Sequence, residues 1–321
     1  MLTSLALVFL IGLMLGSIFN KLKLPSLLGM IITGMILSPY ALNLLDPSIL
    51  GISADLRQLA LIIILTQAGL SLDINDLKKV GRPAILMCFL PACFEIVGVV
   101  LIAPKVLGIS VLEAAIMGSV LGAVSPAVVV PRMLKIMEEG YGKERSIPQL
   151  ILAGASVDDV FVIVLFTAFT SLATGGDFTV SSLLQIPISI LLGIIVGVLL
   201  GITLTIFFKK FHMRDSVKII IILSLSGLLI ELQNILNGII PISGLLAIMS
   251  MGVTIYKKYN ILADRLSAKY SKLWVAAEIL LFVLVGATVD LNYAIQAGIY
   301  SIAIVLGALL FRMVGVYACL L

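Results

Sequence analysis

The segment 147–172 reads IPQLILAGASVDDVFVIVLFTAFTSL and is long and apolar enough to cross a bilayer as one α-helix. Near its middle it holds two adjacent acids, Asp158 and Asp159. Ionisable side chains are costly inside a membrane span, so those that occur there usually have a function. The segment therefore predicts an α-helical membrane protein and indicates where its functional site lies.

The remainder of the chain has the same apolar character. Hydrophobic residues make up 61% of the 321 residues and charged residues only 12%, whereas soluble domains have roughly twice that charged fraction. We therefore predict an all-α integral membrane protein with about eleven transmembrane helices. The predicted spans are 2–19, 24–44, 56–72, 84–107, 114–134, 147–172, 183–208, 217–233, 238–256, 273–290 and 293–320.

Basic residues alternate with these spans. Eighteen of the 21 lysines and arginines follow odd-numbered spans. By the positive-inside rule those loops face the cytoplasm, so we expect a multi-pass protein of the cell membrane with its N-terminus outside. Because the basic residues are dispersed over loops, we expect no nucleic-acid partner. Three cysteines within apolar runs predict neither a disulfide framework nor a metal site, and we expect no cofactor.

Asp158 and Asp159 are suited to hold either a proton or a small cation. Neighbouring residues of a helix point about 100° apart, so both carboxylates can line one cavity. Two adjacent carboxylates repel each other, and a bound proton or cation relieves that repulsion. Deprotonated carboxylates are hard oxygen ligands for a cation. The alternative is a structural polar pair that bonds to other helices.

Two further features favour an ion site. Ser125, Pro126 and Pro131 lie in the fifth span, where prolines oppose a straight helix and free carbonyl groups. This pattern predicts a discontinuous helix, with a simple kink as the alternative. Arg312 lies within the eleventh span and stays charged. It therefore needs a buried carboxylate, for which Asp158 or Asp159 is the natural partner, unless it reaches the membrane interface.

Three glutamates also fall within predicted spans. Glu231 lies near an outer end, where its side chain could reach the interface. For Glu95 and Glu278 we favour a structural role as hydrogen-bonding or packing partners over a functional one.

Several segments resemble the monovalent cation/proton antiporter superfamily, in particular sodium/proton antiporters with an aspartate pair. Ser125-Pro126 falls where the family has its first broken, crossing helix. Asp158-Asp159 falls on its ion-binding acidic pair, and Arg312 matches the basic residue that pairs with the first acid. Three further segments resemble family helices, namely Leu24–Gly29, Gln67–Asp73 and Leu281–Asp290.

The resemblance implies a secondary transporter, not an enzyme, that exchanges Na⁺, or else K⁺ or Li⁺, for protons. It implies an inverted-repeat fold with a first repeat at 1–172, a linking helix at 173–216 and an incomplete second repeat at 217–321. Relatives have roughly thirteen helices, so we expect the last two to be lacking. It also implies a homodimer in the lipid bilayer. Asp158 and Asp159 are the expected Na⁺ ligands, with Arg312 against Asp158, and the candidate supporting residues are Ser156, Gln67 and Glu278.

The chain departs from the family pattern in places. Many relatives have Thr-Asp where Val124-Ser125 stands, and some have Glu in place of Gln67. Asp-Asp pairs usually occur with lysine, whereas this chain has Arg312. An arginine does not release its proton, so proton transport should fall to the aspartates.

Three other functions stay open. An organic-anion carrier of the same fold would need a larger polar cavity. An intramembrane aspartyl protease would need two aspartates from two helices facing one water. A gated potassium channel would be expected to have a soluble ligand-binding domain.

Overall fold

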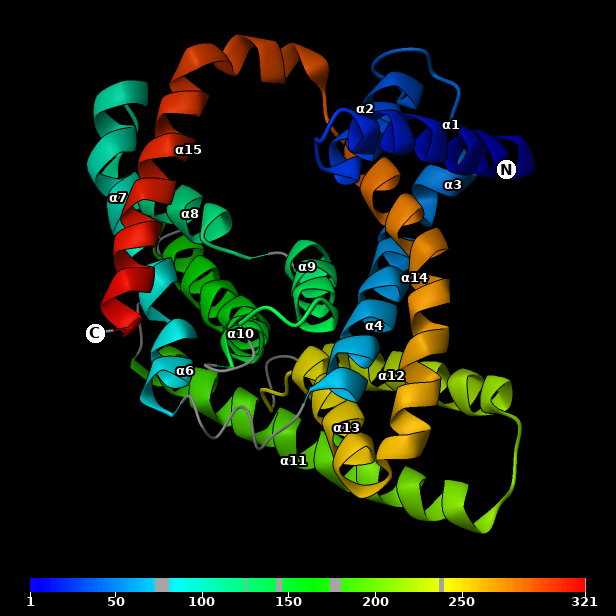
Figure 1. The fold of residues 1–321 in the computed structure, drawn as a ribbon. Coiled ribbons are helices and arrows are strands. Elements are labelled where there is room, and N and C mark those ends of the chain that lie inside the picture. Colours follow the sequence, from blue (N-terminus) through cyan, green and yellow to red (C-terminus); the bar gives the residue numbers. More distant parts are fainter. Residues whose placement is uncertain (73–80, 125, 143–145, 174–179, 237–239, 321) are drawn as a thin grey trace. The chain divides into compact units, whose positions relative to one another are not determined.

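The structure is a computed structural model, and it describes residues 1–72, 81–124, 126–142, 146–173, 180–236 and 240–320. Helices connected by short turns make up the described secondary structure (Figure 1). The chain divides into two compact units. The first comprises Met1–Ile64 and Ala268–Gly298, and the second comprises Leu65–Ser267 and Ile299–Leu321.

In the first unit, helices pack closely through glycines. A Cβ at Gly34 would lie 2.0 Å from the carbonyl O of Val283, and one at Gly286 would lie 2.1 Å from that of Ile31. The two backbones can approach only because neither glycine has a side chain. This unit holds α1 (Leu2–Lys21), α2 (Ser26–Leu37), α3 (Pro47–Gly51), the first part of α4 (Ser53–Ser71), most of α14 (Asn260–Ala287) and the start of α15 (Leu291–Leu320).

We expect Gly34→Ala to destabilise the protein, because the added methyl group would overlap backbone atoms that cannot rotate away. Overpacking of this kind costs about 1–3 kcal/mol. Thermal unfolding in detergent measures the effect. Gly227→Ala in α12 is the matched control: nothing lies within 4 Å of its Cβ position, so alanine should leave stability unchanged or raise it slightly. Equal melting temperatures for the two variants would contradict the close packing at Gly34.

The second unit contains the helices around the predicted acid pair. Glycines again mark one contact, because a Cβ at Gly197 of α11 would lie 2.2 Å from the carbonyl O of Ala247 in α13. The unit also holds the end of α4, the start of α14 and most of α15. Its complete helices are α6 (Arg82–Met87), α7 (Leu90–Leu107), α8 (Val111–Leu121), α9 (Pro126–Glu138), α10 (Ile147–Ala173), α11 (Val180–Lys210), α12 (Asp215–Leu236) and α13 (Gly244–Lys258).

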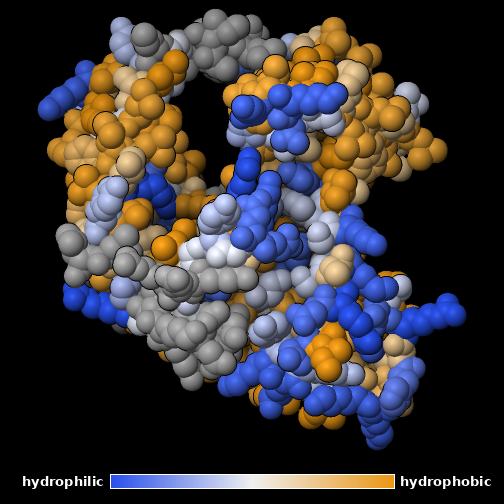
Figure 2. Space-filling view, viewed as in Figure 1, coloured by the Kyte–Doolittle hydropathy of each residue, from blue (hydrophilic) through white to orange (hydrophobic). Residues whose placement is uncertain are grey.

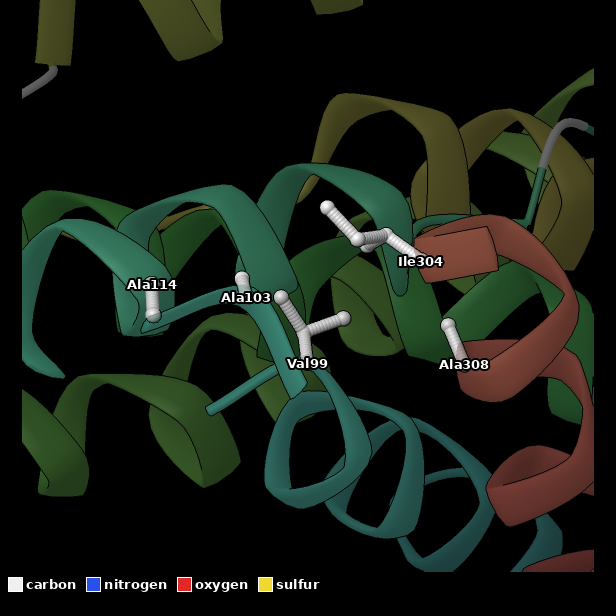
Figure 3. Packing of buried hydrophobic residues seen from close by; sticks show 5 residues of the cluster. All are labelled: Val99, Ala103, Ala114, Ile304 and Ala308. Atoms are coloured by element: carbon white, nitrogen blue, oxygen red, sulfur yellow. The ribbon is translucent and has the colours of Figure 1, made fainter. Parts of the chain in front are cut away.

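Small apolar side chains join α7, α8 and α15 (Figure 3). Ala103 of α7, Ala114 of α8 and Ala308 of α15 are at most 1% exposed. Because alanine lets helices approach closely, these three segments form one tightly packed layer. Val99 and Ile304 complete the buried cluster.

The structure changes the bounds of several predicted spans. The span predicted at 84–107 is two helices, because α6 ends at Met87 and α7 begins at Leu90. In a continuous helix the ring of Pro91 would clash with the carbonyl group of Met87, four residues earlier. The span predicted to end at residue 44 stops at Leu37, since Ser38 precedes a proline and is extended. The basic loop predicted before residue 273 is wrong, because α14 is helical from Asn260 onward.

Six described helices are long and apolar enough to cross a membrane, judged by length and composition. They are Leu2–Lys21, Ile85–Leu107 (counted as one span across the junction of α6 and α7), Pro187–Lys210, Asp215–Leu236, Asn260–Ala287 and Tyr300–Cys319. The predicted total of eleven spans stays a prediction.

Candidate ion-binding site

Arg312 gathers two buried acids and a backbone carbonyl around its guanidinium group. Its Nη2 donates to Asp158 Oδ2 at 3.1 Å, and its Nη1 donates to Glu95 Oε2. Nη1 also donates to the carbonyl O of Gly122 at 2.9 Å. The side chains of Asp158 and Glu95 are 2% and 5% exposed, and that of Arg312 is 19% exposed. Arg312 therefore pairs with internal acids and does not reach outward from its helix.

Close packing of α7 against α15 fixes this arrangement. A Cβ at Gly98 of α7 would lie 2.7 Å from the ring of Phe311, the neighbour of Arg312. One turn further along α15, a Cβ at Gly315 would lie 2.9 Å from the Cα of Pro91 in α7. These glycines let α15 lie directly against α7, which brings Arg312 within reach of the Glu95 carboxylate.

The third group around Arg312 lies at a break in the helical backbone. α8 ends at Leu121 and α9 begins at Pro126, so the span predicted at 114–134 is discontinuous. Carbonyl groups in the last turn of a helix lack intrahelical partners, and Gly122, which follows α8, offers its carbonyl to Arg312. Pro126 starts α9 without an amide hydrogen. Ser125 and the Pro126 side chain lie outside the described residues.

Asp158 has one oxygen held and one oxygen open. Oδ2 accepts from Arg312, whereas the buried Oδ1 has no hydrogen-bond partner of ordinary geometry in the described part of the chain. The backbone amide of Val124, beside the helix break, makes only a weak hydrogen bond to this carboxylate, outside ordinary geometry. A buried acceptor left unpaired costs about 1–3 kcal/mol. The open oxygen is therefore suited to a ligand such as a proton, a cation or water.

The charges of this cluster do not cancel. Glu95 and Asp158 contribute two negative charges when ionised, and Arg312 contributes one positive charge. Asp159 follows Asp158 on α10 and would add a further negative charge, although its side chain lies outside the described residues. A buried excess of negative charge attracts protons and cations and repels anions.

The structure does not place every predicted candidate residue beside Arg312, Glu95 and Asp158. Ser156 lies on α10, one turn before Asp159, with its side chain outside the described residues. Gln67 is 7% exposed on α4, and its Oε1 has no partner among the described residues. Glu278 belongs to the other unit, on α14. Among described residues, no three His, Cys, Asp or Glu side chains form a metal-binding group.

Glu95 is a partner of Arg312 that the sequence did not predict for it. The prediction for Glu95 was a structural hydrogen-bonding or packing role, and only the two aspartates were predicted as partners for Arg312. An unpaired carboxylate within a span is as costly as an unpaired guanidinium. The position of Glu95 inside the fourth predicted span was therefore a usable signal that it too needed a partner.

A family model described as "Sodium/hydrogen exchanger, transmembrane" matches residues 5–321. The chain belongs to the sodium/hydrogen exchanger family. Among solved structures, it is similar to the sodium proton antiporter MjNhaP1 from Methanocaldococcus jannaschii, with a TM-score of 0.80 and 21% identity. That likeness covers 98% of this chain and 77% of the other. The predicted resemblance and the predicted antiporter fold are confirmed.

Named relatives match part of this exchanger-family chain. Sodium/hydrogen exchanger 9B2 from Homo sapiens is 39% identical over 163 residues, which is 50% of this chain and 30% of that protein. Its counterpart from Bison bison bison is 36% identical over 177 residues, or 53% and 33% of the two chains. Sodium/hydrogen exchanger 9B1 from Mus musculus is 37% identical over 164 residues, or 50% and 29%. The matches span about a third of these relatives' length.

Proposed function

We propose that this chain exchanges a monovalent cation, most simply Na⁺ with K⁺ or Li⁺ as alternatives, for protons across the cell membrane. The observation that carries the proposal is the buried carboxylate of Asp158 beside the interrupted helix. One of its oxygens is held by Arg312, and the other has no hydrogen-bond partner of ordinary geometry in the described part of the chain. Family membership supports the same reaction.

The charges suggest how one site could serve both ions. Arg312 keeps its proton at any ordinary pH, so the exchanged proton must sit on a carboxylate. We infer that Arg312 holds Asp158 in place and that Asp159, together with the open oxygen of Asp158, binds either a proton or a cation. Binding of one ion removes the charge that attracts the other, and this competition is what exchange requires.

Movement of the site between the two sides would complete the cycle. Many secondary transporters rock one group of helices against another around a site at a broken helix. We propose that 1–172 and 217–321 are the two inverted repeats, joined by 173–216, and that α8 to α10 and α15 move together with the site. A homodimer and an external N-terminus remain part of the proposal.

An organic-anion carrier of the same fold fits the site less well. Such a carrier needs positive charge to attract its substrate. Here the only guanidinium at the described site is shared by Glu95 and Asp158, so the cluster is net negative when both acids are ionised. The paired state of Arg312 therefore favours cation exchange.

Transport in proteoliposomes tests the proposal. Purified protein is reconstituted with an inside-acidic pH gradient that a trapped dye reports. Adding Na⁺ or Li⁺ outside should dissipate the gradient, since each cation that enters releases protons from the lumen. An equal concentration of choline and protein-free vesicles are the controls. A gradient that collapses equally with choline, or is unaffected by Na⁺, Li⁺ and K⁺ alike, would reject cation/proton exchange.

A further inference from the structure

Four lysines lie together where α11 and α13 end. Lys209 and Lys210 close α11, and Lys257 and Lys258 close α13. The two helix ends touch, because Lys209 Nζ donates to the carbonyl O of Lys258 at 3.2 Å. All four side chains are exposed. Figure 2 shows hydrophilic surface over the part of the molecule where Figure 1 draws these ends, at the lower right. We call these four residues the lysine cluster.

The acidic residues near the lysine cluster are too few to neutralise its positive charge. Segments 206–218 and 256–265 hold seven lysines and arginines but only two acids. One of the acids, Asp215, already faces Lys218 Nζ at 3.8 Å and Arg265 Nη2 at 3.3 Å. In the part of the chain that the structure describes, no acid forms an ion pair with the lysine cluster. Concentrated positive charge thus lies where two apolar helices stop.

Aromatic rings accompany the lysines. Phe207 and Phe211 of α11 are exposed, with ring centroids 4.9 Å apart. Lys210 Nζ lies 5.8 Å from the Phe211 ring centroid, and Lys209 Nζ lies 5.4 Å from that of Tyr259. Aromatic and basic side chains together are typical of the membrane–water interface. The contacts of Lys209 also fix its ammonium group, which lowers the entropy lost when a ligand binds.

We propose that the lysine cluster binds the phosphate headgroup of an anionic lipid from the adjoining leaflet. Several ammonium groups just beyond a membrane helix match such a headgroup in charge and depth. The exposed rings of Phe207 and Phe211, with exposed Ile206, offer apolar surface for the lipid's acyl chains. A lipid engages both features at once, whereas a free phosphate ion would use only the lysines.

Lipid binding to two charge-matched variants tests this proposal. The first variant combines Lys209→Gln, Lys210→Gln, Lys257→Gln and Lys258→Gln. The control combines Lys21→Gln, Lys23→Gln, Lys105→Gln and Lys272→Gln, which are also exposed. Native mass spectrometry in mild detergent then counts bound phosphatidylglycerol against phosphatidylcholine. Each interfacial lysine is worth about a fivefold gain in affinity, so removing four of them should weaken phosphatidylglycerol binding roughly six-hundredfold, whereas the control should bind as tightly as wild type.

Three outcomes would overturn the proposal. Equal losses in both variants would mean that net charge alone attracts the lipid. Displacement of the lipid by soluble glycerol phosphate at similar concentration would mean that the site binds free anions. Unchanged binding in the first variant would place the lipid elsewhere. If that variant unfolds, Lys257→Gln with Lys258→Gln suffices, because Lys209 bonds to the main chain of Lys258 and keeps its contact.

Discussion

Asp159→Asn should abolish cation-driven proton movement and leave the protein inserted and folded. Asparagine has nearly the same size but cannot ionise, so it neither neutralises a cation nor takes up the exchanged proton. Asp159 follows Asp158 on α10, and in the proposed site it is the acid that Arg312 does not hold. The transport rate should therefore fall to that of protein-free vesicles.

The control for this variant is Asp55→Asn, which removes an exposed acid from the first turn of α4. It should transport as the wild type does. Asp159→Glu should retain part of the activity, because it keeps the charge and changes only its reach. Unfolding temperatures measured beside the transport rates separate loss of function from loss of fold. Normal exchange by Asp159→Asn would remove this residue from the proposed site.

Features that depend on neighbouring residues in the sequence, such as a single helix or a break at a proline, were predictable. The span predicted at 147–172 is the helix Ile147–Ala173, since an uninterrupted apolar run has one stable form in a bilayer. The break before Pro126 was also predictable, because a proline cannot supply the amide hydrogen that a continuous helix uses. Pro91 is a signal of the same kind, although the span predicted at 84–107 did not take it into account.

Contacts between distant segments were harder to predict. Arg312 and Glu95 are 217 residues apart, and which acids reach the guanidinium depends on how α7 and α15 pack. The carbonyl of Gly122 gives no sequence signal as a ligand, because every residue has one. The start of α14 was missed for another reason. The charged stretch 257–272 fell between the predicted spans 238–256 and 273–290, although charged side chains are also compatible with a helix that extends beyond the bilayer.

Arg312→Gln should destabilise the protein strongly, by about 3–5 kcal/mol, because it leaves two buried carboxylates without their counter-charge. Glu95 and Asp158 are 5% and 2% exposed and therefore gain little from water. Denaturant or thermal unfolding in detergent measures the loss. Arg214→Gln removes an exposed guanidinium and should change stability by less than about 1 kcal/mol.

Adding a second change should recover part of that loss. In Arg312→Gln with Glu95→Gln, or Arg312→Gln with Asp158→Asn, one unpaired carboxylate is replaced by a neutral amide. Each pair should therefore be more stable than Arg312→Gln alone, with coupling energies of about 0.5–3 kcal/mol. If the stability losses of Arg312→Gln and Asp158→Asn simply add in the double variant, the 3.1 Å contact between Arg312 and Asp158 contributes nothing. Glu95 alone would then neutralise the arginine. Coupling to both acids would mean that one guanidinium is divided between them. In that case neither acid is fully neutralised, and the residual negative charge is available to attract a cation at the proposed site.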